Sequence, residues 1–130
     1  SKKTTISGAD FVSAKRNEAI NLVVSERSGC DYCLAAHSLT GKMAGYSLAQ
    51  TQALRRGEYP DDARIDALVK FVSTVVSTRG TLAEETVTRF LAAGFSDRQV
   101  VEIISAISAI LFTNMINRVN DTVVDFPHVN

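Results

Sequence analysis

Apolar residues recur every three or four positions along most of the chain, which is the spacing of one face of an α-helix. The clearest stripe lies between Asp61 and Gly80, and it consists of Ile65, Leu68, Val69, Val72, Val75 and Val76. No pair of segments shows the strict alternation that is typical of a strand hairpin. We therefore predict an all-α fold of about six helices, in a single domain that covers residues 1–130.

Capping residues, glycines and prolines predict where these helices begin and end. After a loose polar segment from Lys2 to Gly8, we expect a helix from Asp10 to Arg27. Five more are expected, from Asp31 to Ala44 with Gly45 as its C-cap, from Ser47 to Arg56, from Asp61 to Gly80, from Thr81 to Gly94 and from Asp97 to Val119. Capping boxes are expected to open the last two helices, at Thr81 with Glu84 and at Ser96 with Gln99.

The predicted last helix is apolar in nearly every direction, through Val100, Ile103, Ile104, Ile107, Ile110, Leu111 and Met115. A helix of this kind requires burial on more than one side, so part of it is expected to contact another subunit. We therefore predict a homo-oligomer, dimer-based and as large as a hexamer. Asn114 and Asn117 on the same helix could reach the active site in a folded dimer, but we interpret them as amides that are satisfied by helix packing.

Candidate chemistry is concentrated between Glu18 and His37, in the segment EAINLVVSERSGCDYCLAAH. It holds the only two cysteines, Cys30 and Cys33, at the predicted start of a helix, where unpaired N–H groups favour a thiolate. Their spacing allows a disulfide between them. At ~100° per residue, Cys33 and His37 lie only ~40° apart on one helix face, so the imidazole is expected to reach the sulfur.

One carboxylate falls among apolar residues on the predicted inner face of the N-terminal helix, which consists of Phe11, Ala14, Glu18 and Leu22. Burial on this face would suit Glu18 for passing protons. The alternative is that Glu18 is a solvated charge beside Lys15 or Arg16.

The pattern Glu18-x11-Cys30-x2-Cys33-x3-His37 closely resembles the alkylhydroperoxidase D-like (AhpD-like) proteins of the carboxymuconolactone decarboxylase superfamily. The segment FTNMINRVNDTVVDFP is similar to the ending of the small peroxidase-related members. The resemblance implies an AhpD-like helical bundle with one copy of the helical unit. It also implies that Cys33 attacks a hydroperoxide, that Cys30 resolves the product, and that Glu18 and His37 relay protons, with water as a further member. Tyr32 stands where the better-known alkylhydroperoxidases carry a histidine.

The resemblance further implies a dithiol reductant, either a lipoyl-bearing or a thioredoxin-like protein, and no cofactor. Two other functions use the same residues. The cysteine pair could serve a protein or lipoyl disulfide reductase or a redox sensor. Alternatively, the two cysteines and His37 could bind a metal, with Glu18 as a fourth ligand, although structural zinc sites usually join two separate ligand pairs.

Composition and charge limit the partners, cofactors and location that we expect. Lys and Arg total 14, as do Asp and Glu, and there is no long basic run, so we expect neither a nucleic acid nor an anionic membrane as partner. No glycine-rich phosphate-binding motif is found, so a nucleotide cofactor is not expected. No apolar stretch is expected to reach the roughly 18 residues of a membrane span, and residues 1–10 lack the apolar core of a signal peptide. A cytoplasmic location is therefore expected.

Overall fold

The computed structural model describes the backbone of residues 2–130 and the side chains of residues 14–130. Within these residues it contains helices and no strand. The helices are α1 (Lys2–Ser28), α2 (Asp31–Met43), α3 (Leu48–Arg55), α4 (Ala63–Thr78), α5 (Glu84–Ala92) and α6 (Asp97–Asn120). The prediction of an all-α fold of about six helices is therefore confirmed.

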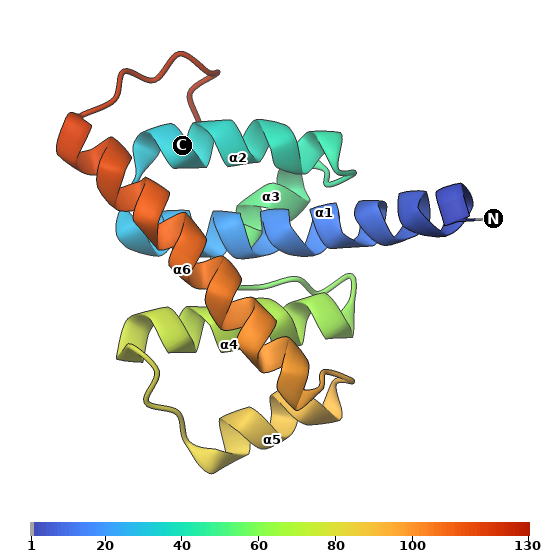
Figure 1. Ribbon diagram of the computed structural model, residues 1–130. Helices are drawn as coiled ribbons and strands as arrows, with labels where there is room; N and C mark the ends of the chain where they lie inside the picture. The colour runs from blue at the N-terminus through green and yellow to red at the C-terminus, as the bar shows by residue number, and fades with distance from the viewer. Residues whose placement is uncertain (1) are drawn as a thin grey trace.

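Helix α1 runs through the middle of the fold, with α2 and α3 on one side and α4 and α5 on the other (Figure 1). Helix α6 starts beside α5, crosses α4 and α1 on a diagonal, and ends next to the beginning of α2 (Figure 1). Two side-chain contacts mark this last approach, from Arg118 to the Ser28 carbonyl and from Asn117 to Cys33. The end of α6 therefore lies against the first turn of α2, which carries the two cysteines.

The core consists of two clusters of buried residues, and α1 contributes to both. On the side of α4, α5 and α6, the buried residues are Ile20, Val23, Val24, Leu68, Phe71, Val72, Phe90, Phe95, Ile103, Ile107 and Ile110. A second cluster joins α1 to α3 and also includes Val69 of α4; its buried residues are Ala19, Leu22, Tyr46, Leu54, Tyr59 and Val69. The second half of α1 contributes to both clusters, so the position of Glu18 is fixed by packing on neighbouring faces of its own helix.

Three predictions about helix ends and faces are wrong. Residues Lys2 to Gly8, expected to be loose, are part of α1. Ala14, expected on the inner face, is exposed. The predicted place of Phe11 on that face lies outside the described side chains, whereas Leu22 is fully buried, as expected.

The third wrong prediction is the capping box of α5. Ser47 and Ser96 open α3 and α6 with reciprocal hydrogen bonds to Gln50 and Gln99. In contrast, α5 begins only at Glu84. Its N-cap is Ala83, and no side-chain hydrogen bond from the described residues caps this helix. The residues before Ala83 remain outside the helix because Leu82 packs against the core from an extended segment.

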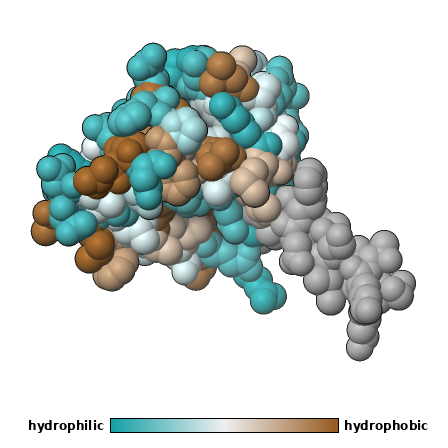
Figure 2. Space-filling view, turned by 90° about the horizontal axis from the view of Figure 1, so that it is seen from above, coloured by the Kyte–Doolittle hydropathy of each residue, from teal (hydrophilic) through white to brown (hydrophobic). Residues whose placement is uncertain are grey.

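Helix α6 buries one face and leaves a second apolar face exposed. The buried residues are Ile103, Ile107, Ile110 and Asn114, and the exposed apolar ones are Val101, Ile104, Phe112, Met115, Ile116 and Val119. Apolar side chains gather on the side of the molecule where α6 ends (Figure 2). Contrary to expectation, α6 is also long and apolar enough to cross a membrane, with a mean hydropathy of 1.7 over 18 residues. A core helix of a soluble protein meets the same criterion.

Candidate functional site

The two cysteines form a disulfide at the first turn of α2. Gly29 adopts a φ of +67°, a conformation that suits glycine, and it turns the chain from α1 into α2. Cys30 is the N-cap of α2, and its amide donates to the Ser25 carbonyl at 3.1 Å. The Cα atoms of Cys30 and Cys33 are 5.2 Å apart, and the Cys33 amide donates to Cys30 Sγ at 3.2 Å. The predicted pairing is therefore confirmed, and it is compatible with a redox role.

The disulfide is enclosed by protein. Cys30 is 1% exposed and Cys33 is 3% exposed. On the α6 side, Asn117 Nδ2 lies 3.7 Å from Cys33 Sγ. Between the cysteines in sequence, the Tyr32 ring packs edge-on against Phe126 of the C-terminal segment, with ring centres 5.5 Å apart. A reactant must therefore be small or slender to reach either sulfur.

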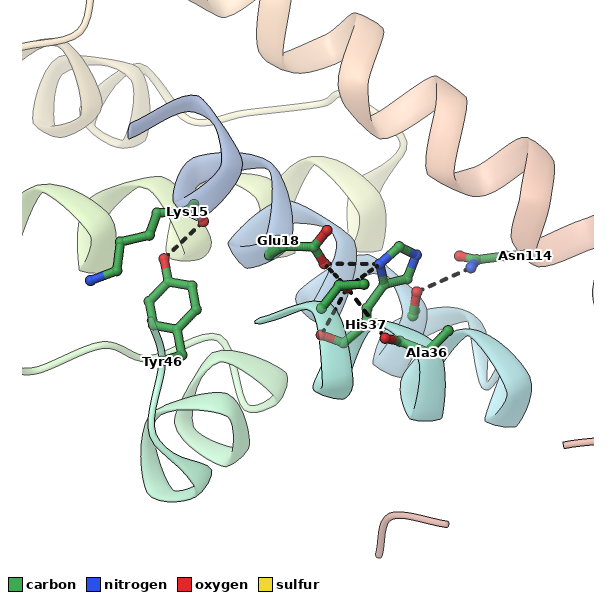
Figure 3. Close-up of polar contacts among 8 residues, drawn as sticks. Lys15, Glu18, Ala36, His37, Tyr46 and Asn114 are labelled. Carbon is green, nitrogen blue, oxygen red and sulfur yellow. Dashed lines mark hydrogen bonds and ion pairs between the residues drawn. The ribbon is translucent and has the colours of Figure 1, made fainter. Parts of the chain in front are cut away.

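Glu18 of α1 and His37 of α2 form a polar pair across the interface of these helices (Figure 3). Glu18 Oε2 lies 2.9 Å from His37 Nδ1 and accepts a hydrogen bond from Thr40 Oγ1 at 2.8 Å. The two side chains are only 16% and 24% exposed. Glu18 is therefore not a solvated charge beside Lys15 or Arg16. A carboxylate at Nδ1 favours the tautomer with its proton on Nδ1, so that Nε2 presents a lone pair.

Two features of the α1–α2 interface hold this pair together. Gly41 faces α1, and a Cβ atom at this position would be in van der Waals contact with Leu22 Cδ1 at 3.4 Å. Just after α2, the Tyr46 hydroxyl donates to the Lys15 carbonyl at 2.8 Å (Figure 3). Burial, followed by the charges of neighbouring groups, raises the pKa of Tyr46, so its hydroxyl stays protonated as the donor. The C-terminal end of α2 is thus held against α1.

The relation of His37 to the sulfur differs from expectation. His37 Nδ1 is directed to Glu18 and lies 3.4 Å from Thr40 Oγ1. Among the described side chains, no hydrogen bond joins the imidazole to Cys30 or Cys33. The predicted direct contact is therefore not present in the disulfide form. A proton that moves between the sulfur and His37 requires a bridging molecule, such as water or substrate.

The sequence analysis missed one polar residue of the site, Thr40, and did not assign two others, Asn114 and Asn117, to it. Thr40 could have been noticed, because it lies three residues after His37 and hence on the same helix face. Asn114 and Asn117 were interpreted as packing amides. Buried Asn114 does join α6 to α1, through a hydrogen bond to Ser25, as a packing amide would. Asn117 donates to the Thr113 carbonyl of its own helix at 2.9 Å and also contacts Cys33 Sγ. Only the crossing of α6 over α1 brings these asparagines to the cysteines, and local sequence carries no signal of it.

Within residues 14–130, no group of three or more His, Cys, Asp or Glu side chains is arranged to hold a metal ion. No protein-family model matches the chain, and no curated protein matches it. The functional conclusion therefore rests on the geometry of the disulfide and of the Glu18–His37 pair.

Proposed function

We propose that this chain is a thiol-dependent hydroperoxide reductase of the AhpD-like type, within the carboxymuconolactone decarboxylase superfamily. The observation that carries the proposal is a disulfide at the N-terminus of α2 and, one turn further along this helix, a histidine that pairs with a carboxylate of α1. The helix N-terminus supplies N–H groups that stabilise a thiolate, and the pair supplies a base that can accept and return a proton.

The reaction begins with the reduced cysteines. The Cys33 thiol gives its proton to His37 Nε2 through a bridging molecule, and Glu18 stabilises the imidazolium that forms. The thiolate attacks the terminal oxygen of a hydroperoxide, the O–O bond breaks, and the alkoxide takes a proton from His37 to leave as an alcohol. This step oxidises Cys33 to a sulfenic acid. The Cys30 thiol then displaces hydroxide, which leaves as water, and the disulfide forms.

An external dithiol closes the cycle by exchange with this disulfide. Because Cys30 and Cys33 are 1% and 3% exposed, a thiol on a flat protein surface cannot approach them closely. A lipoyl group on its slender arm fits this restriction better than the surface thiol of a thioredoxin-like protein. The same restriction favours a small hydroperoxide as substrate over a protein disulfide, which a disulfide reductase would require.

The proposal is tested by adding one equivalent of cumene hydroperoxide to the reduced protein in the absence of other thiols. We expect one equivalent of peroxide to be consumed per chain and both free thiols to be lost, as measured by thiol titration and mass spectrometry. If both thiols remain while the same sample is still oxidised to the disulfide by a disulfide reagent, the cysteines are redox-active but are not those of a peroxidase.

We also propose that the exposed face of α6 forms an interface in a homo-oligomer, which is dimer-based and as large as a hexamer. Phe112, Met115, Ile116 and Val119 are each more than half exposed and form one apolar surface on the last turns of α6. Burial of such side chains contributes roughly 1.5–3 kcal/mol each. Light scattering of Met115→Glu should show a smaller particle than the parent, and a 14 kDa parent would contradict the proposal.

A reducing cytoplasm is the compartment that we propose for this thiol chemistry.

A further inference from the structure

Asn114 carries a buried polar atom with no hydrogen-bond partner in the described part of the chain. The residue is 1% exposed, and its Nδ2 donates to Ser25 Oγ at 3.1 Å. Its carbonyl oxygen, Oδ1, has no partner there. Buried polar atoms almost always have a hydrogen-bond partner. Oδ1 of Asn114, which is free among the described residues, is therefore available to accept a hydrogen bond from a bound molecule.

This oxygen lies within the candidate site. Asn114 is one helical turn before Asn117, whose amide touches Cys33 Sγ. On the other side, Ser25 bonds to Asn114 through its hydroxyl and to the Cys30 amide through its carbonyl. Figure 3 shows the Asn114 side chain extending from α6, with its hydrogen bond to Ser25 drawn as a dashed line. The unsatisfied acceptor on α6 is therefore close to both cysteines in the contact network, to Cys33 by way of Asn117 and to Cys30 by way of Ser25.

We propose that Asn114 is the residue that binds the hydroperoxide and orients it for attack by Cys33. The inference rests on the proposed function and adds the substrate-binding group. Asn114 Oδ1 accepts a hydrogen bond from the terminal O–H of the hydroperoxide, which holds that oxygen near the Cys33 thiolate. The S–O bond forms at this oxygen, which keeps its hydrogen and becomes the sulfenic acid. The O–O bond breaks, and the inner oxygen takes the proton from His37 Nε2.

This arrangement gives the two asparagines different tasks. Asn117 presents an N–H donor to the sulfur, which suits the negative charge of a thiolate. Asn114 presents an acceptor, which suits the O–H of the substrate and repels an anion. The O–H group of a hydroperoxide can donate the hydrogen bond that Oδ1 does not receive from the described part of the protein. An alkylating agent such as iodoacetamide reacts at a carbon atom and needs no acceptor there. Comparing the two reagents at Cys33 therefore separates binding of the substrate from reactivity of the thiolate.

The test uses Cys30→Ser as parent, so that Cys33 is the only thiol. Second-order rate constants are measured for cumene hydroperoxide and for iodoacetamide in the parent and after Asn114→Leu. Asn114→Ala is the second variant, in case the leucine does not fit. Asn120→Leu is the matched control, because it makes the same exchange at an exposed position of α6. Loss of one substrate hydrogen bond should slow the hydroperoxide reaction about tenfold, with alkylation within about twofold of the parent. Asn120→Leu should change neither rate.

Two results would overturn the role of Asn114 alone. One is a parent that reacts with hydroperoxide while both Asn114 variants react equally fast, even if they unfold at lower temperature, because Asn114 would then hold a structural water only. The other is an equal fall of both rate constants, which would mean that the substitution disturbs the thiolate or its access. A parent that is alkylated normally but does not react with hydroperoxide would instead contradict the proposed function, and this inference would fall with it.

Discussion

Neutralising Glu18 gives a quantitative test of the proton relay. Glu18→Gln keeps the size of the side chain and an oxygen for Thr40, but removes the negative charge 2.9 Å from His37 Nδ1. Only the part of the interaction that strengthens when the imidazole becomes charged affects the rate. A charge-assisted hydrogen bond contributes about 1.5–3 kcal/mol. At about 1.4 kcal/mol per factor of ten, this corresponds to a roughly 10- to 100-fold slower reaction. Partial exposure of both side chains, 16% and 24%, screens the charge and favours the lower half of this range.

The assay is stopped-flow measurement of the reaction of reduced protein with cumene hydroperoxide at constant pH. Glu58→Gln is the matched control, because it removes the same charge from an exposed pair with Arg56, which is 3.8 Å away. Glu58→Gln should react as fast as the parent. A Glu18→Gln rate within twofold of the parent would refute the relay, and an equal loss in both variants would show that only the net charge matters.

Three further substitutions test other parts of the account. Asn117→Leu removes the donor to Cys33 Sγ and should slow alkylation of reduced Cys33 by iodoacetamide several-fold at neutral pH, because less thiolate is present; an unchanged rate would exclude the role of this contact. For Asp66, burial acts to raise the pKa of the carboxyl, but hydrogen bonds from Lys70 and a backbone amide outweigh it and lower the pKa below 3.8. The stability from this group is therefore fully present above pH 3.8 and is lost as pH falls through the lowered pKa, so Asp66→Asn should reduce the free energy of unfolding by about 1 kcal/mol at pH 7 and by less at acidic pH, as measured by urea titration. Phe90 is 1% exposed and stacks on two other phenylalanines, so Phe90→Ala should cost about 3–5 kcal/mol in the same titration; a loss under 1 kcal/mol would contradict the packing described.

The helices and most of their ends could be predicted from local sequence patterns. The capping boxes at Ser47 and Ser96 depend on residues three positions apart, so they can be predicted without tertiary structure. The box expected at Thr81 with Glu84 has the same spacing but does not form, because packing of Leu82 against the core outweighs a local preference. The exposure of Ala14 likewise depends on which helices lie beside α1, and periodicity within one helix cannot show this.

The site was predictable only in part. The proximity of Cys30 and Cys33 follows from their spacing in one turn. The contact between Glu18 and His37 joins two helices, and it was anticipated through resemblance to a family and not through periodicity. The contact of Asn117 with Cys33 spans 84 residues and depends on the path of α6, which no local pattern encodes.

The central claim is that Cys33 attacks a hydroperoxide and Cys30 resolves the product. The most direct measurement is mass spectrometry of single-cysteine variants after one equivalent of cumene hydroperoxide and a reagent that traps sulfenic acids. The account predicts that Cys30→Ser consumes about one equivalent and carries the trapped sulfenic acid at Cys33, and that Cys33→Ser consumes none. A sulfenic acid at Cys30 in Cys33→Ser, with an unreactive Cys30→Ser, would reverse the roles of the two thiols. No sulfenic acid in either variant would contradict hydroperoxide reduction itself.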